Sequence, residues 1–251
     1  MRRATDLGSN KTGMDLTPEM AEQMERGAQE GAAAGEAESH ALSQLRHDYI
    51  NDAPPVGSTP PPATVKGTTK LATQMLRGRR PSVFMDKLGE RLAFERTGTR
   101  LYEALITKYD ALGSWDGGPT REQLVAFHDE EHKHFETVRE AVESLGGDPT
   151  AMTPSADVAG VAASGLIQVI TDARTSLAEA LHAIHIAELA DNDAWQMLIR
   201  LAEGMGQDNL ATRFRVALAE EEKHLAAVRH WLAAEMEQDA QGGVAAKPPV
   251  H

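Results

Sequence analysis

Apolar residues recur at intervals of three and four along four segments in the second half of the chain. This spacing places them on one face of an α-helix, while the polar residues between them face solvent. The pattern predicts four amphipathic helices, over residues Val83–Leu112, Thr120–Leu145, Arg174–Glu203 and Asp208–Glu237.

The connections between these segments predict the topology. Glycine-rich turns follow Leu112 and Glu203, and such short turns make antiparallel neighbours of the helices that they join. The middle connection, Asp148–Gly165, is longer, and we expect Ser155 to cap a crossover helix over Ala156–Ile170. The sequence therefore predicts an all-α fold, an antiparallel four-helix bundle with a long crossover between its second and third helices.

The bundle is expected to occupy residues 81–240, after an N-terminal extension over residues 1–80 and before a disordered tail over residues 241–251. Thr17–Pro18 is a typical helix start, which predicts one helix over residues 18–50 of the extension. Its prolines predict a semi-rigid linker over residues 53–64, and a short turn is expected at Leu71–Leu76.

Composition narrows the class of function. The chain contains no cysteine, which excludes disulfides, Fe–S clusters and cysteine-ligated iron sites. Its net charge of −13 disfavours binding to nucleic acid or to anionic membranes and attracts cations. The N-terminus lacks the apolar stretch of a secretory signal, and no segment is apolar enough to cross a bilayer. We therefore expect a cytoplasmic protein.

A glutamate interrupts the apolar stripe of each predicted bundle helix near its middle. These residues are Glu95, Glu131, Glu188 and Glu221. The second and the fourth begin E-x-x-H motifs, so that His134 and His224 lie one turn further along the same helix faces. Unpaired buried carboxylates cost several kcal/mol each, and converging ones repel one another. Two divalent cations would neutralise four of them, and oxygen ligands with some imidazole suit iron or manganese.

Other polar residues near these motifs have simpler interpretations. One E-x-x-H motif alone is ordinary on an exposed, salt-bridged helix face. We expect Glu130, Glu220 and Glu222 to face solvent. We expect Asp191 to be a hydrogen-bond partner of the imidazoles. The remaining histidines of the bundle are expected to serve surface, supporting or packing roles, and these are His128, His132, His182, His185 and His230.

From Val83 to Glu237 the ordered set of a glutamate, an E-x-x-H motif, a glutamate and a second E-x-x-H motif resembles the ferritin-like di-iron superfamily, nearest to rubrerythrin and bacterioferritin. The resemblance implies that Glu131 and Glu221 bridge two metal ions. It also implies a terminal carboxylate and one imidazole for each ion, from Glu95 with His134 and from Glu188 with His224. Tyr102 lies where rubrerythrins keep a tyrosine near the metals. Because no cysteine-ligated domain is present, electrons must come from a separate donor.

We therefore expect a non-haem di-iron (or manganese–iron) oxidoreductase that activates dioxygen or peroxide, of the peroxidase or ferroxidase type, with substrate oxygenation as a variant. Two alternatives stay open: a subunit of an iron-storage or detoxification cage, and a metal-stabilised scaffold that binds a partner through the N-terminal extension. A homodimer or higher homo-oligomer is expected on general grounds.

Overall fold

The computed structural model describes residues 23, 26, 40–61 and 80–241. By their contacts these residues fall into two units, one reaching to residue 56 and the other beginning at residue 57. Outside its connections the second unit is helical, and the part of the chain that the structure describes contains no strand. The predicted all-α fold class is confirmed.

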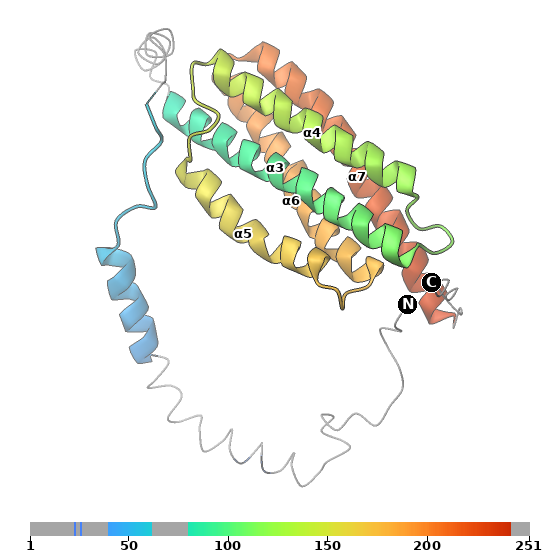
Figure 1. Ribbon diagram of the computed structural model, residues 1–251. Helices are drawn as coiled ribbons and strands as arrows, with labels where there is room; N and C mark the ends of the chain where they lie inside the picture. The colour runs from blue at the N-terminus through green and yellow to red at the C-terminus, as the bar shows by residue number, and fades with distance from the viewer. Residues whose placement is uncertain (1–22, 24–25, 27–39, 62–79, 242–251) are drawn as a thin grey trace. The chain divides into compact units, whose positions relative to one another are not determined.

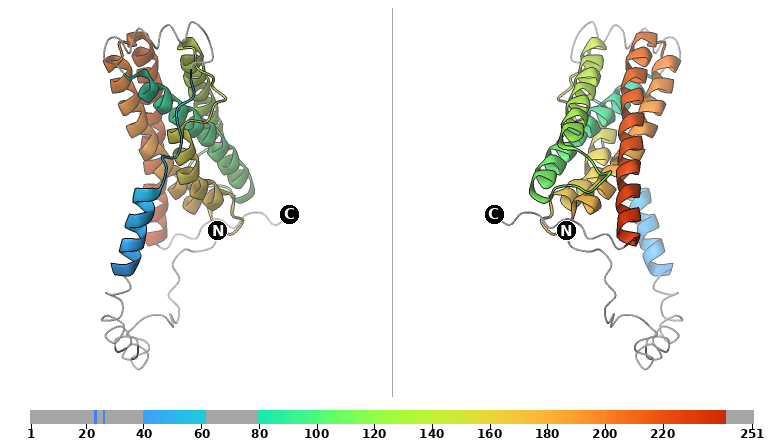
Figure 2. Two further views of the ribbon diagram at one scale, coloured as in Figure 1. Left: turned by 90° about the vertical axis from the view of Figure 1, so that its left-hand side faces the viewer. Right: turned by 90° about the vertical axis from the view of Figure 1, so that its right-hand side faces the viewer.

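The second unit is the predicted four-helix bundle with a crossover helix. Helices α3 and α4 form one antiparallel pair, and helices α6 and α7 form the other (Figure 1). Helix α5 connects the pairs and packs against both α3 and α6, as the two side views also show (Figure 2). The helices span Pro81–Leu112 (α3), Arg121–Ser144 (α4), Pro154–Thr171 (α5), Leu177–Gly204 (α6) and Asp208–Ala240 (α7).

Side-chain caps set the starts of α4 and α6. Thr120 accepts a hydrogen bond from the backbone N–H of Gln123, whose side chain accepts one in return, so α4 begins where the sequence predicts. Ser176 and Glu179 form the same capping box at α6. Helix α6 therefore begins at Leu177 and not at Arg174. Arg174 lies in the preceding turn, where its backbone N–H and its guanidinium donate hydrogen bonds to the Asp172 carboxylate.

The crossover helix α5 begins at Pro154, two residues earlier than predicted. Its cap is Thr153, which accepts a hydrogen bond from the backbone N–H of Ala156, and Pro154 occupies the first helical position. Ser155, the predicted cap, instead donates from its backbone N–H and its hydroxyl to the Asp86 carboxylate, at 2.9 and 2.6 Å. Ser155 therefore fastens α5 to α3 instead of starting the helix.

The buried apolar side chains of the bundle form two clusters, one on each side of a polar layer. One cluster includes Leu88, Val138 and Trp195, and the other includes Leu101, Ile184 and Trp231. Each bundle helix contributes to both clusters, and its buried glutamate lies between the two contributions. The four helices therefore place their buried carboxylates at one level of the bundle.

The other unit contributes a helix over residues 40–52, on which Leu42, Leu45 and Tyr49 are exposed. Residues 53–61 carry no regular secondary structure. Most of the predicted helix over residues 18–50, the predicted turn at Leu71–Leu76 and the tail from residue 242 lie outside the described residues. The predicted domain boundary near residue 80 stays a prediction. None of the described helices is long and apolar enough to cross a membrane.

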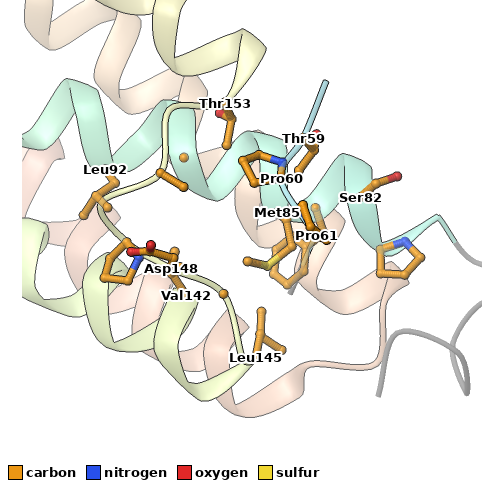
Figure 3. Close-up of a pocket in the computed structure, with 16 residues that line it drawn as sticks. Thr59, Pro60, Pro61, Ser82, Met85, Leu92, Val142, Leu145, Asp148 and Thr153 are labelled. Carbon is orange, nitrogen blue, oxygen red and sulfur yellow. The ribbon is translucent and has the colours of Figure 1, made fainter. Parts of the chain in front are cut away.

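A cavity of about 180 Å³ lies at the end of the bundle where α3 begins. Met85 and Leu92 of α3, Leu145 beyond α4, and Pro60 and Pro61 of the preceding segment line it (Figure 3). Its walls are mostly apolar, and none of the acidic residues of the polar layer reaches it. The cavity is therefore separate from the site described next.

The capping box of α4 predicts a measurable loss of stability. Thr120→Ala removes one of the two reciprocal hydrogen bonds, and we expect the free energy of unfolding to fall by about 1 kcal/mol. Thr120→Ser keeps the hydroxyl and should retain the native stability, because serine is at least as good a cap as threonine. Urea denaturation of the metal-free protein measures both values, and an unchanged Thr120→Ala variant would contradict the role of the cap.

Candidate metal centre

The polar layer brings together all six residues predicted as metal ligands. They are Glu95 on α3, Glu131 and His134 on α4, Glu188 on α6, and Glu221 and His224 on α7. Each is at most 2% exposed to solvent. Four carboxylates and two imidazoles therefore converge from four helices in a region that water does not reach.

These residues form two overlapping groups, within each of which one ligand atom per residue lies within 4.8 Å of the others. Glu131 and Glu221 belong to both groups. One group is completed by Glu95 and His134, and the other by Glu188 and His224. The geometry thus offers two adjacent positions for a metal ion, with two carboxylates shared between them.

Glu221 divides its oxygens between the two positions. Its Oε1 lies 2.6 Å from His134 Nδ1, and its Oε2 lies 3.3 Å from His224 Nδ1. The terminal carboxylates face the same imidazole atoms, at 3.9 Å for Glu95 Oε2 and 4.0 Å for Glu188 Oε1. In both groups it is therefore Nδ1 of the imidazole that points at the carboxylates.

Each of the six residues has at least one buried side-chain atom that forms no hydrogen bond of good geometry among the described residues, although Glu95 Oε1, Glu221 Oε1 and His134 Nδ1 lie at ion-pair distance from another group. These atoms are both carboxylate oxygens of Glu95 and Glu221, Oε2 of Glu131 and Glu188, and Nδ1 of His134 and His224. Buried polar atoms that lack a partner are costly and uncommon. Oxygen and imidazole nitrogen at such positions are the donors that a hard or intermediate divalent cation takes. The residues present therefore fit a pair of metal ions.

The far side of each imidazole is held by a glutamate from the facing helix. His134 Nε2 donates to Glu220 Oε2 at 2.8 Å, and His224 Nε2 donates to Glu130 Oε2 at 2.7 Å. Each of these glutamates directly precedes the shared glutamate of its own helix. A carboxylate behind a ligating imidazole fixes the ring and raises its basicity.

This arrangement corrects two expectations. Glu130 and Glu220 were expected to face solvent, but their side chains are only 35% and 16% exposed because the narrow contact between α4 and α7 encloses them. Glu222 is exposed, as expected. Asp191 was expected to support the imidazoles, yet its carboxylate lies 2.6 Å from Nη1 of Arg91 instead.

Arg91 is a buried cation that the sequence analysis missed. It is 2% exposed, and its Nε lies 2.8 Å from Glu95 Oε1. The sequence held a signal for it, since Leu88, Arg91 and Glu95 follow the three-and-four spacing of a buried face.

Tyr102 and Asn192 hold the α6 side of the layer. The hydroxyl of Tyr102, placed on the same face as Glu95 as predicted, donates to Glu188 Oε1. The side-chain amide of Asn192 donates to the backbone carbonyls of Glu188 and Glu221, at 3.0 and 3.2 Å. The Asn192 contacts, which the sequence analysis did not anticipate, lock α6 and α7 together at the level of the carboxylates.

The other histidines of the bundle lie outside both groups. His132, His182 and His230 are exposed, and His128 and His185 are partly buried.

Comparison with known proteins identifies the family. The rubrerythrin family model matches residues 86–232, more than half of the chain and a span that includes all six residues. This chain belongs to the rubrerythrin family. No curated protein and no solved structure gives a significant match. The predicted resemblance to ferritin-like di-iron carboxylate proteins is confirmed at the level of the family.

In this member of the rubrerythrin family, burial strongly perturbs the acids of the layer. Burial, followed by the neighbouring carboxylates, raises the pKa of Glu95, Glu188 and Asp191 well above their ordinary values. Burial also raises the pKa of Glu131. Without cations between them, these carboxyl groups therefore bind protons more tightly than exposed ones do.

Burial has the opposite effect on the pKa of an imidazole, which it lowers. Burial alone would lower the pKa of His224, but the Glu131 and Glu221 carboxylates beside it raise that pKa to about 12. Burial alone would also lower the pKa of His134, but the Glu221 and Glu220 carboxylates raise it above its ordinary value. At Glu221 burial is outweighed by the two imidazoles, which lower its pKa. In the metal-free protein these shifts favour protons on the two imidazoles and on four of the five buried carboxyl groups, but not on Glu221.

Gly98 makes room for one of the shared carboxylates. It lies on α3 opposite Glu131, and a Cβ at this position would overlap the Glu131 carboxylate group. A glycine in a helix interior costs about 1 kcal/mol relative to alanine. Close approach of Glu131 to the α3 backbone is the physical reason for glycine here.

The pKa directions predict how the stability of the metal-free protein depends on pH. Glu95, Glu188, Asp191 and His224 have folded pKa values above their unfolded ones, so their contribution to stability is complete below the unfolded pKa values. It is lost as the pH rises through the folded values. The lowered pKa of Glu221 gives stability that is lost only as the pH falls below its unfolded value, so it does not change this trend between about pH 6 and about pH 8. We expect a lower Tm at about pH 8 than at about pH 6.

Thermal unfolding at several pH values, with chelator and with bound metal, measures this effect. Metal ions displace the protons, so the metal-loaded protein should lose most of the pH dependence over this range. A Tm of the metal-free protein that rises from about pH 6 to about pH 8 would contradict the assignment of protons to this layer.

Gly98→Ala should damage metal binding while leaving the helices intact. The added methyl group displaces the Glu131 carboxylate, so we expect metal affinity to fall by about tenfold or more. Gly160→Ala on α5 is the matched control, because a Cβ there meets nothing within 4 Å. The control should retain native affinity and gain up to about 1 kcal/mol of stability. Equal affinities in the two variants would show that Gly98 is not needed for space.

Proposed function

We propose that this protein binds two iron ions, or one iron and one manganese ion, and acts as an oxidoreductase of the peroxidase or ferroxidase type. In this proposal Glu131 and Glu221 bridge the ions. Glu95 and His134 complete one ligand set, and Glu188 and His224 complete the other. The observation that carries the proposal is the convergence of buried carboxylate and imidazole atoms in two overlapping groups, within each of which one ligand atom per residue lies within 4.8 Å of the others.

Charge supports two ions and not one. Five carboxylates are buried in the layer, those of the four ligand glutamates and of Asp191, and Arg91 supplies one permanent positive charge. Four negative charges remain when all the acids are ionised and the imidazoles are neutral. Two divalent cations balance them, whereas a single ion would leave two negative charges in an apolar surrounding.

When bound, two ferrous ions supply the two electrons by which one peroxide molecule and two protons become two water molecules. The protein's own groups hold the site ready for this chemistry. Glu130 and Glu220 orient the imidazoles. Tyr102 keeps its proton on the side of Glu188, since burial and the nearby carboxylates raise its pKa well above the ordinary value. Tyr102 is our candidate for a redox or hydrogen-bonding role there.

The apolar clusters on either side of the layer exclude water and limit side reactions. The chain offers no cysteine to bind a second iron centre, so the proposal includes a separate electron donor. Cytoplasmic location and assembly into a homodimer or larger oligomer stay predictions.

Metal analysis of variants tests the bridging roles. Because a bridging carboxylate serves both positions, Glu131→Ala and Glu221→Ala should each weaken the binding of both ions by more than about a hundredfold. Glu222→Ala removes an exposed carboxylate next to Glu221 and should leave binding unchanged. Two ions bound at native affinity by Glu221→Ala would refute the proposed ligand set.

Anaerobic loading with ferrous iron, followed by mixing with peroxide or with dioxygen, tests the chemistry. We expect rapid oxidation of two iron ions per chain, seen as a near-ultraviolet absorbance, and consumption of one peroxide for each pair. If neither oxidant oxidises the bound ferrous iron, the metal ions have a structural role and the scaffold alternative is favoured.

A further inference from the structure

The two metal positions share their bridging residues but differ in what lies behind the terminal carboxylates. Behind Glu95 lies the guanidinium of Arg91, with Nε 2.8 Å from Glu95 Oε1. Behind Glu188 lies the neutral hydroxyl of Tyr102. The repeated motifs of the sequence therefore produce a centre whose halves are electrostatically different.

Arg91 is a fixed part of the layer. Asp191 on α6 holds its Nη1 at 2.6 Å, so the side chain links α3 to α6. Its guanidinium carbon lies 4.4 Å from the ring centre of Phe94 and 5.6 Å from that of Trp195. Burial would lower the pKa of Arg91, but Asp191 and Glu95 raise it, so the group keeps its charge.

Arg91 also contacts one of the two oxygens of Glu95. Oε1 of Glu95 is engaged by the guanidinium, and only Oε2 faces His134 Nδ1. At the other position Oε1 of Glu188 faces His224 Nδ1 and accepts a hydrogen bond from the neutral hydroxyl of Tyr102. Each terminal carboxylate thus has one contacted oxygen, but the contact to Glu95 is an ion pair with a cation, which competes with a metal ion for that oxygen, whereas the contact to Glu188 is a neutral hydrogen bond.

We propose that Arg91 is a positioning residue that forms an ion pair with one oxygen of Glu95, weakens that carboxylate as a metal ligand and so makes the two metal positions unequal. The position formed by Glu188 and His224 fills first, and the position formed by Glu95 and His134 binds the second ion more weakly. Asp191 compensates the charge of Arg91 within the layer, so the inequality comes from the engaged oxygen and not from net charge. This inference rests on the proposed two-metal site.

Titration of the metal-free protein with Mn(II) tests the inequality, because Mn(II) reports its own surroundings and needs no turnover. Calorimetry gives the two dissociation constants, and electron paramagnetic resonance distinguishes isolated ions from coupled pairs. In the native chain we expect dissociation constants that differ by about tenfold or more, and mostly isolated Mn(II) when one ion per chain has been added.

Variants assign the inequality to Arg91. Arg91→Met with Asp191→Asn removes the pair without changing the net charge, and the ratio of the two dissociation constants should fall by about tenfold, with coupled pairs forming from the start of the titration. Arg100→Met replaces an exposed arginine of the same helix and should keep the native ratio. An unchanged ratio in the double variant would overturn the inference.

Two single variants keep the test decisive if the double variant does not fold. Glu188→Gln should remove the tight binding event, and Glu95→Gln should remove the weak one and leave the tight one. The reverse assignment, or two equal events in the native chain, would refute the unequal positions while leaving the two-metal proposal intact. A native chain that binds no Mn(II) and no Fe(II) would instead refute the proposed function itself.

Discussion

Repulsion among carboxylates enclosed away from water is the interaction on which this structure depends. Four bundle helices bring five acidic side chains to one level, where solvent cannot screen them. The apolar clusters above and below this level favour folding, but the layer between them opposes it unless positive charge is present. Protons, a guanidinium and metal ions are the sources of positive charge that these side chains can use.

The surrounding residues keep the carboxylates in place in spite of this repulsion. Glu130 and Glu220 exchange hydrogen bonds with the imidazoles of the facing helix, so α4 and α7 are joined at this level although they touch little elsewhere. Asn192 joins α6 to α7 through backbone carbonyls, and Gly98 lets Glu131 approach α3. Each contact holds a donor atom in position before any metal arrives, which reduces the reorganisation that binding requires.

The sequence predicted the fold and the inner residues because both follow from one regularity. Glu95, Glu131, Glu188 and Glu221 stand out as acids on otherwise apolar helical stripes, a pattern that only a compensated buried charge explains. Glu130 and Glu220 carry no such signal, since a residue next to a core position normally points to solvent. Their burial depends on how closely α4 and α7 approach, which periodicity does not encode. The need for a glycine at position 98 likewise appears only once the opposite carboxylate is placed.

Arg91 shows most clearly why local patterns do not determine the chemistry of a repeated motif. The two hairpins carry near-copies of one sequence, D-E-E-H-K-H and A-E-E-E-K-H, and they place equivalent ligand atoms around the two positions. The residues that touch the terminal carboxylates are not copies of each other: Arg91 on α3 meets Glu95, and Tyr102, also on α3, meets Glu188. Because both lie on α3, a single helix gives one position a charged neighbour and the other a neutral one. The ligand residues of the two positions are thus equivalent, and the positions differ in the residues that contact the terminal carboxylates.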